Sequence, residues 1–233
     1  MIAIHAKNIQ KSRGKRLILD LDLHFTDGGL HVILGPNGCG KTTLLRLLAL
    51  LDTPDNGEIL LSDNTNDLTQ NLKTRHNVVL VPRPDGLFNH SVHQNVEYGL
   101  KLRHIAKTQR LEQVQKVLEA VNLTHLSRSN ALSLSSGEKQ RLCMAMAIAV
   151  KPDVILLDEP TSSLDPHNGH QVEQIILQLK KENRMIILVT HNISQARRLA
   201  DTVTFMGTDT MISQNPAEAF FTTFDQDGLD GYL

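Results

Sequence analysis

The chain has 233 residues, of which 40% are hydrophobic, so it can bury one large core, and a disordered chain is excluded. Its formal net charge of −1 gives no indication of the strongly basic surface that is typical of proteins binding nucleic acid or anionic lipid, and leaves only local basic patches open. No stretch approaches the ~18 apolar residues of a membrane span, and the N-terminus has no secretory pattern, so we expect a soluble cytoplasmic protein.

The first half of the chain is predicted to begin with strands and then to become helical. Apolar patterning predicts strands at residues 2–6, 17–25, 30–34, 57–61 and 78–81. A turn is expected at 27–29 and a helix at 44–51. The helical period then extends from about residue 91 to 130. Within that stretch, residues 110–121 carry an apolar face, and Thr108 is the expected N-cap.

Strands and helices alternate after residue 150, which is typical of a mainly parallel sheet with right-handed crossovers. The predicted strands are 154–157, 185–189, 202–206 and 210–213, and the predicted helices are 168–182 and 194–200. We expect one domain, residues 1–233, in which a core of 1–83 and 151–233 is interrupted by a helical subdomain at about 84–150. The last ten residues look like a polar tail.

A phosphate-binding loop is predicted between the strand at 30–34 and the following helix. The chain matches G-x-x-x-x-G-K-[ST] with Gly35, Pro36, Asn37, Gly38, Cys39, Gly40, Lys41, Thr42 and Thr43. The glycines allow backbone N–H groups to turn toward a phosphate chain at a helix N-terminus. Lys41 can reach the terminal phosphates, and the Thr42 hydroxyl can ligate Mg²⁺. The alternative is a glycine-rich turn without a ligand, but the strand–loop–helix setting favours nucleotide binding.

The two cysteines indicate a reducing environment rather than a disulfide or zinc protein. Cys39 and Cys143 are far apart in the chain and form no C-x-x-C pair. A free thiol at Cys39, inside the phosphate loop, would make activity sensitive to alkylation or oxidation if it is exposed.

Two further motifs offer polar groups at the ends of regular elements. Asp158 and Glu159 follow the strand at 154–157, where Asp158 can support the Mg²⁺ shell and Glu159 can polarise an attacking water. Adjacent acids can also form only a cap or a solvated turn, but the upstream phosphate loop favours the catalytic interpretation. Leu134-Ser135-Ser136-Gly137-Glu138 opens a helix and is either a second anion-binding N-terminus or an ordinary capped helix.

The order of the motifs resembles that of an ATP-binding cassette (ABC) ATPase over essentially the whole chain. These motifs are the phosphate loop, L-S-S-G-E-K-Q-R at 134–141, I-L-L-D-E-P at 155–160, Ser163-Leu164-Asp165 and Val189-Thr190-His191. The resemblance implies an α/β P-loop NTPase fold, with a RecA-like mainly parallel sheet, an antiparallel β subdomain and an inserted α-helical subdomain. It also implies a head-to-tail dimer of two copies of this chain. Each ATP, with Mg²⁺, would lie between residues 35–43 of one copy and 135–138 of the other.

The resemblance further assigns roles to individual residues. Glu159 would be the catalytic base, His191 would contact the γ-phosphate, and Lys41 would neutralise phosphate charge. Thr42 and Asp158 would hold the metal. Asp165 would lie in the loop that crosses the dimer seam, and the remaining nucleotide contacts would come from Arg13, Ser135, Ser136, Gly137 and Glu138. Taken alone, a histidine after a strand is more often structural, and only the set of motifs supports a role for His191.

Three positions depart from the pattern of the family. Arg83 stands where a glutamine is expected, and arginine has no acceptor oxygen for a metal ion. Arg13 aligns with the aromatic residue that stacks on adenine, although a guanidinium plane can also stack on a base. Ser136 replaces the first glycine of the signature pair. These departures affect the expected rate and nucleotide selectivity, and they keep a poorly hydrolysing pseudo-ATPase open as an alternative.

A single cassette without a membrane segment resembles the separate energising subunit of a prokaryotic importer. Residues 95–103 fit the region that docks on a membrane permease, so the expected partners are that permease and, indirectly, a substrate-binding protein, without nucleic acid. The expected location is cytoplasmic, peripheral on the inner face of the cell membrane. Residues 190–201 and 216–221 look most like tungstate importer subunits. Importers of molybdate, phosphate or another substrate, and a non-transport ABC switch protein, remain alternatives.

Overall fold

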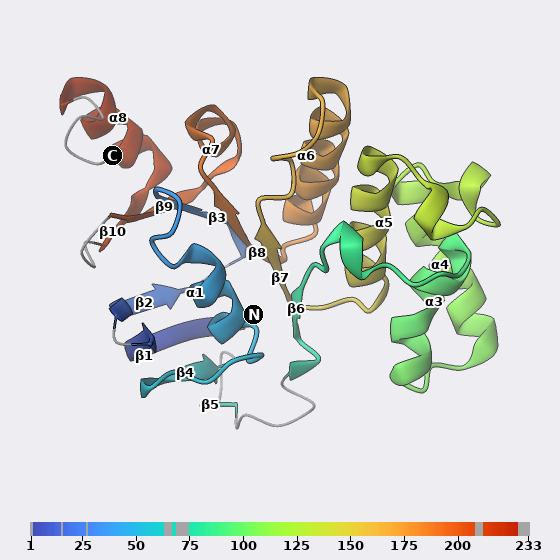
Figure 1. Cartoon of the computed structure of the whole chain (residues 1–233), viewed down its shortest axis with the longest axis horizontal. Coiled ribbons are helices and arrows are strands. Elements are labelled where there is room, and N and C mark those ends of the chain that lie inside the picture. Colours follow the sequence, from blue (N-terminus) through green and yellow to red (C-terminus); the bar gives the residue numbers. More distant parts are fainter. Residues whose placement is uncertain are drawn as a thin grey trace. The chain divides into compact units, whose positions relative to one another are not determined.

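The computed structural model describes residues 2–14, 16–26, 28–62, 67–68, 75–207 and 212–227, which form two compact units (Figure 1). The first unit comprises Met1–Leu80, Asp153–Glu159 and Leu179–Leu233, and the second comprises Val81–Pro152 and Pro160–Gln178. The helical subdomain expected at 84–150 thus differs from the second unit, which also takes in residues 160–178. These residues include most of helix α6 (Pro166–Lys181). They belong to the second unit because Asn168 and Gln171 of α6 accept hydrogen bonds from Arg141.

An antiparallel sheet begins the first unit. Its strand order is β2-β1-β4-β5, with bounds β1 Ala3–Arg13, β2 Arg16–Phe25, β4 Asn56–Ser62 and β5 Asp67–Leu68. Strand β1 extends well beyond the predicted 2–6, since two register shifts let it follow β2 as far as the pair Arg13 and Arg16. The expectation of an antiparallel β subdomain is confirmed.

The second sheet of this unit is mainly parallel and has the order β10-β9-β3-β8-β7-β6. Its strands are β3 (Gly29–Leu34), β6 (Val78–Leu80), β7 (Val154–Asp158), β8 (Met185–Thr190), β9 (Thr202–Met206) and β10 (Ile212–Pro216). All neighbours pair in parallel except β10 with β9. The central strands are buried along almost their whole length, which accounts for their uninterrupted apolar sequences. Residues 210 and 211 of the predicted strand 210–213 lie outside the described residues.

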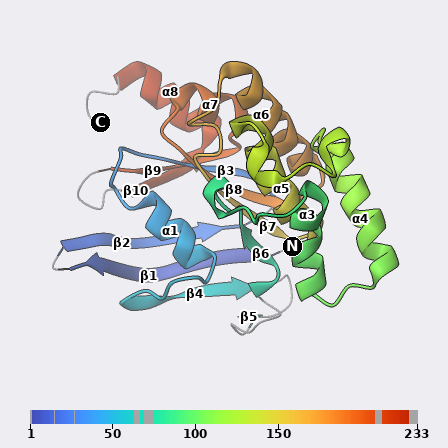
Figure 2. The ribbon, with the colours of Figure 1, turned by 45° about the vertical axis from the view of Figure 1, so that its right-hand side comes forward.

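Helix α1 (Lys41–Leu48) packs between the two sheets, as both views show (Figures 1 and 2). Its leucines at 44, 45, 47 and 48 are fully buried with apolar residues from both sheets, including Phe25 of β2 and Val189 of β8. The residue that opens this helix, Lys41, is therefore held by the core of the unit.

Two short helices complete the first unit, and one of them corrects a prediction. Helix α7 (Ile193–Leu199) packs on β3 and β8, and helix α8 (Ala217–Asp227) packs on β9 and β10. The polar tail predicted for the last ten residues is wrong for 224–227, which continue α8, while 228–233 lie outside the described residues. Helix α8 is fixed because Asp225 accepts two hydrogen bonds from Arg197 of α7, at 2.6 and 2.9 Å, and Phe221 lies under the same guanidinium.

The regular elements of the second unit are all helices among its described residues, apart from an isolated β-bridge between Ser91 and Asn130. This unit contains α3 (Val92–Leu102), α4 (Lys107–Ala120), α5 (Ser136–Ala149), most of α6, and the 3₁₀ turns η1 (Pro84–Gly86), η2 (Thr124–Leu126) and η3 (Ala131–Ser133). Helices α3, α4 and α5 contact one another pairwise.

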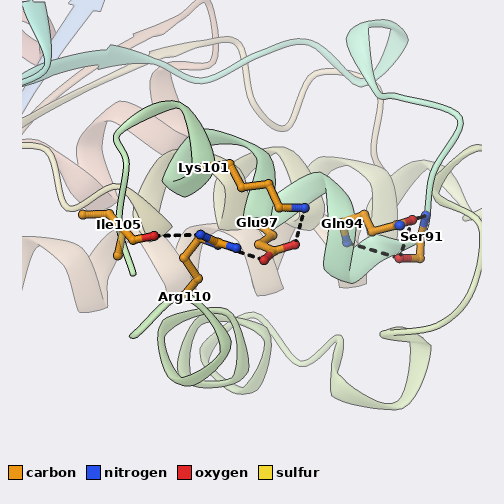
Figure 3. Close-up of polar contacts among 6 residues, drawn as sticks. All are labelled: Ser91, Gln94, Glu97, Lys101, Ile105 and Arg110. Atoms are coloured by element: carbon orange, nitrogen blue, oxygen red, sulfur yellow. Dashed lines mark hydrogen bonds and ion pairs between the residues drawn. The ribbon is translucent and has the colours of Figure 1, made fainter. Parts of the chain in front are cut away.

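The predicted N-cap Thr108 is wrong, because α4 already begins at Lys107 and its N-cap is Ala106, without a side-chain cap bond. The helix entrance is fixed instead by Arg110, which donates to the backbone oxygen of Ile105 and to the carboxylate of Glu97 on α3 (Figure 3). A tertiary contact thus replaces the local cap. Helix α3, by contrast, starts with a capping box formed by Ser91 and Gln94.

Candidate nucleotide-binding and catalytic site

The phosphate loop joins strand β3 to helix α1, as the motif predicts. Gly38 and Gly40 have positive φ angles of 84° and 103°, which L side chains rarely adopt. Gly40 is the N-cap of α1, and a Cβ atom built there would lie 2.7 Å from Leu19. The backbone thus turns sharply just where the N–H groups of the first helical turn become free, which makes an anion-binding concavity.

Lys41 lies folded against this loop. Its Nζ atom donates hydrogen bonds of 2.8 Å to the carbonyl oxygens of Gly35 and Pro36, and the residue is only 6% exposed. A buried ammonium group with carbonyl partners is a ready donor for phosphate oxygens, because it can exchange neutral acceptors for charged ones.

Thr42 and Asp158 are in direct contact, although they are 116 positions apart. The Thr42 hydroxyl donates to the two carboxylate oxygens at 3.0 and 3.2 Å. Asp158 ends β7, and Thr42 belongs to the first turn of the helix after β3, so the parallel sheet brings the two to one edge. A hydroxyl and a carboxylate are hard oxygen ligands of the kind that Mg²⁺ prefers. Groups of three or more His, Cys, Asp or Glu suited to a metal are absent from the described residues, so a cation here would take further ligands from phosphate and water.

Glu159 and His191 form the second contact at this edge. The Oε1 atom of Glu159 lies 3.1 Å from Nδ1 of His191, which follows β8. The backbone of Glu159 has a φ of 47°, and its N–H group donates to the carbonyl of Val189 at 2.9 Å. This unusual conformation for a non-glycine residue turns the carboxylate toward His191. The glutamate side chain is 28% exposed and can be reached by water.

A cavity of about 330 Å³ opens beside the phosphate loop. It is lined by Arg13, Arg16, Ile18, Gly38, Gly40, Thr42 and Thr43. The structure therefore brings Arg13 to the phosphate loop, as expected from the sequence. Arg16 was missed, because it joins this lining through its pairing with Arg13 between β1 and β2, which only the structure shows.

A second cavity, of about 260 Å³, lies on the other side of the loop. Its lining consists of Leu34, Gly35, Pro36, Asn37, His191, Ile193, Phe205 and Phe224. The contribution of Phe224 was also missed, because the residues around it were taken for a tail.

The remaining candidate residues belong to the second unit. Ser135 is the N-cap of α5 and forms a capping box with Glu138, in which the backbone N–H and hydroxyl of Ser135 donate to the carboxylate at 2.8 and 2.7 Å. These bonds lower the pKa of Glu138. Ser136 and Gly137 form the first turn of α5, and the exposed Arg83 is the N-cap of η1. The structure thus groups Lys41, Thr42, Asp158, Glu159 and His191 in the first unit, and Arg83 and residues 135–138 in the second.

The two cysteines are free thiols. Cys39 is partly buried in the phosphate loop, and burial raises its pKa. Cys143 is fully buried in α5, where burial raises its pKa to about 12. Both thiols are therefore protonated near neutral pH and poorly nucleophilic.

Comparisons with known proteins show what the chain is similar to. Residues 18–162 match the model of the family described as ABC transporter. The chain is 36% identical over 205 residues to the tungstate uptake system ATP-binding protein TupC of Peptoclostridium acidaminophilum, covering 87% of this chain and 94% of that protein. It is also 36% identical over 243 residues to the phosphate import ATP-binding protein PstB 1 of Enterococcus faecalis, covering 99% and 96%.

A third relative and a solved structure are also similar to this chain. The Fe(3+) ions import ATP-binding protein FbpC of Mannheimia succiniciproducens is 35% identical over 218 residues, which cover 92% of this chain and 62% of that protein. CbiO1 of Clostridium perfringens, described as part of the ABC transporter complex cbiONQ, shares the fold with a TM-score of 0.82 at 24% identity, over 97% of this chain and 94% of that one. Among the described residues, no helix has both the length and the apolar character needed to span a membrane.

Proposed function

This chain belongs to the ABC transporter family, and we propose that it hydrolyses ATP to drive uptake of an oxyanion, with tungstate as the favoured ion. As an ABC importer ATPase it binds ATP and works with a membrane permease. The observation that carries the proposal is the meeting of Lys41, Thr42, Asp158, Glu159 and His191 at one edge of the parallel sheet.

Each of these residues has a step in the proposed reaction. Lys41 exchanges its carbonyl partners for phosphate oxygens and neutralises their charge. Glu159 accepts a proton from the water that attacks the γ-phosphate in line. His191 holds the Glu159 carboxylate through Nδ1, which leaves Nε2 free to contact the γ-phosphate.

Thr42 and Asp158 would hold the metal ion, because their oxygens are of the kind that Mg²⁺ prefers and already lie within hydrogen-bond distance of each other. The ion would supply neutralisation of the charge on the phosphate oxygens.

The nucleotide site is completed by a second copy of the chain. The N-terminal turn of α5 offers the hydroxyl group of Ser136 and the backbone N–H groups of Ser136 and Gly137 to the γ-phosphate of the partner's ATP, while Ser135 caps the turn. Two sandwiched ATP molecules drive closure of the dimer, and hydrolysis resets it. The protein would lie on the cytoplasmic face of the membrane, bound to its permease, with a substrate-binding protein on the other side.

The choice of tungstate is supported by the 36% identity to TupC, which spans 94% of that protein. The phosphate importer subunit PstB 1 has the same identity, so phosphate is the alternative that a test must separate. Selectivity for the ion belongs to the permease and binding protein, and residues of this chain do not contact the transported ion.

An uptake experiment tests the proposal. The gene is deleted in its host, and cells carrying the wild type or Glu159→Gln are assayed for uptake of tungstate, molybdate and phosphate. We expect tungstate uptake to be lost on deletion and restored only by the wild type. Loss of phosphate or molybdate uptake alone would refute the choice of tungstate. Unchanged uptake of all three anions would refute all three as the substrate and leave an importer of another substrate or a non-transport switch protein.

A further inference from the structure

Asn168, in the first turn of α6, connects two segments of the second unit that are distant in sequence. Its side-chain oxygen accepts a hydrogen bond of 3.0 Å from Arg141 of α5, and its Nδ2 atom donates a bond of 2.6 Å to Oδ2 of Asp165. The backbone N–H group of Asn168 donates to Oδ1 of the same carboxylate at 3.0 Å. Both oxygens of Asp165 are thus held by this one residue.

Arg141 fixes the orientation of the Asn168 amide. Its guanidinium group has only donors, so the side-chain oxygen of Asn168 must face it and the NH₂ group must face Asp165. Arg141 is only 7% exposed, and its second partner is also an amide oxygen, that of Gln171 at 2.5 Å. Only a residue with both a donor and an acceptor can fill position 168 without leaving one of the two neighbours unsatisfied.

Gly137 allows the first turn of α5 to approach this amide. A Cβ atom built on Gly137 would lie well inside van der Waals distance of the Asn168 side chain. The absence of a side chain at 137 is thus required by packing within the chain. The turn at 135–137 therefore packs closely against the side chain whose amide group binds the carboxylate of Asp165.

The contact with Asn168 also affects the ionisation of Asp165. The hydrogen bonds from the side chain and then the backbone of Asn168 lower the pKa of this exposed carboxyl group. Asp165 is thus ionised at neutral pH, with both oxygens directed by Asn168.

We propose that Asn168 is a positioning residue that fixes Asp165 to the N-terminal turn of α5, so that both reach the partner's nucleotide as one rigid group. This inference rests on the proposed function, in which the turn at 135–137 acts on ATP bound by the other copy, and on the expectation that Asp165 lies in the loop that crosses the dimer seam. Asn168 itself touches neither nucleotide nor metal. Its loss should therefore reduce turnover and ATP-driven dimer formation, but leave binding of ATP to the phosphate loop of its own chain unchanged.

The experiment compares Asn168→Ala and Asn168→Asp with Gln171→Ala. Aspartate keeps the shape and the acceptor for Arg141, but it lacks the donor and places a second charge beside Asp165. Gln171→Ala removes the other acceptor of Arg141 and leaves Asp165 untouched, so it is the matched control. Measurements are kcat and KM for ATP, ATP affinity, the melting temperature, and ATP-dependent dimerisation in a Glu159→Gln background.

For both Asn168 variants we expect kcat to fall about tenfold or more, with ATP affinity within about twofold of the wild type and weaker dimerisation. Gln171→Ala should keep kcat within about twofold. If Asn168→Ala fails to fold, the isosteric Asn168→Asp still decides the question.

Three results would overturn the inference. If Glu159→Gln alone dimerises with ATP and both Asn168 variants match the wild type in kcat, the positioning role is wrong while the proposed function stands. If Gln171→Ala loses as much activity as the Asn168 variants, the effect is packing around Arg141 and not the link to Asp165. If Glu159→Gln alone does not dimerise with ATP, the dimer itself is refuted, and the inference with it.

Discussion

Glu159 and His191 touch at 3.1 Å, and they do so because each follows one of two neighbouring parallel strands. The bond from the Glu159 N–H group to Val189 ties the backbone of one residue to the strand that carries the other. A shift of either side chain therefore changes the position of its partner. The two residues form one unit in the proposed hydrolysis.

Replacing Glu159 with glutamine should reduce ATP hydrolysis about 10²–10⁴-fold, because the amide cannot accept the proton of the attacking water. ATP affinity should remain within about threefold of the wild type, since Lys41 and the loop glycines are intact. Phosphate release and nucleotide binding are the measurements, with the exposed Glu218→Gln as control. A turnover that is already negligible in the wild type and does not fall further would identify a pseudo-ATPase, whereas a substantial turnover that does not change would refute Glu159 as the base.

A double substitution tests whether Glu159 and His191 act together. His191→Ala alone should lower kcat about tenfold or more. In the Glu159→Gln background, the same change should add little, because residues that act as a unit have non-additive effects. The four kcat values of the cycle provide the coupling free energy. Additive losses would mean that the contact has no part in catalysis.

The buried ammonium group of Lys41 leads to a test that separates binding from stability. Lys41→Met keeps the apolar stem but removes the charge, so ATP binding should weaken about tenfold or more. The free energy of unfolding should fall by no more than about 1 kcal/mol, since the lost partners are two carbonyl oxygens. Nucleotide titration and urea unfolding measure the two effects, with the exposed Lys107→Met as control. Unchanged ATP affinity would contradict the assignment.

Local sequence patterns were sufficient to predict the parallel sheet and the phosphate loop. The strands around β3, β7 and β8 are buried on both faces and read as continuous apolar runs, and the loop needs its glycines at fixed positions. The contact of Thr42 with Asp158 also follows, because parallel strands place their carboxyl ends at one edge.

The features that were missed depend on contacts between distant residues. Helix α8 continues to Asp227 because Arg197, 28 positions before Asp225, binds its carboxylate, and no local pattern encodes that pair. The start of α4 is fixed by Arg110 and Glu97 instead of a cap at Thr108. Arg16 joins the cavity of Arg13 only through the register of two strands. Local propensity does not contain this information.

The arginine pair beside the phosphate loop should limit the affinity for adenine nucleotides. Arg13→Tyr places an aromatic face in the cavity and should lower KM for ATP about threefold to tenfold, because base–aromatic stacking contributes about 1–3 kcal/mol. The same substitution also removes one of the two neighbouring positive charges in the cavity, those of Arg13 and Arg16. Steady-state hydrolysis gives KM, and Arg13→Ala is the control, for which KM should not fall. An increase in KM for Arg13→Tyr would indicate that Arg13 binds phosphate and not the base.

Glu97 should be the most important charged residue for the stability of the second unit. Its side chain is 9% exposed and accepts hydrogen bonds from Lys101 at 2.7 Å and Arg110 at 2.9 Å (Figure 3). Glu97→Ala leaves the largely buried guanidinium of Arg110 without its carboxylate, which should cost about 3 kcal/mol in urea unfolding at pH 7. Glu112→Ala, which breaks the exposed pair with Lys116, is the control and should leave the free energy of unfolding nearly unchanged.

The pH dependence of this effect follows from the pKa of Glu97. Burial opposes the charged form, but the bonds from Lys101 and Arg110 outweigh it, so the folded pKa lies below the ordinary value of 4.5. The stabilisation is then complete above pH 4.5 and is lost as the pH falls through the lower, folded pKa. The stability difference between the wild type and Glu97→Gln should accordingly shrink on acidification below that pH. A constant difference down to about pH 3 would show that Glu97 stabilises the helices through packing, because the charge would then contribute nothing.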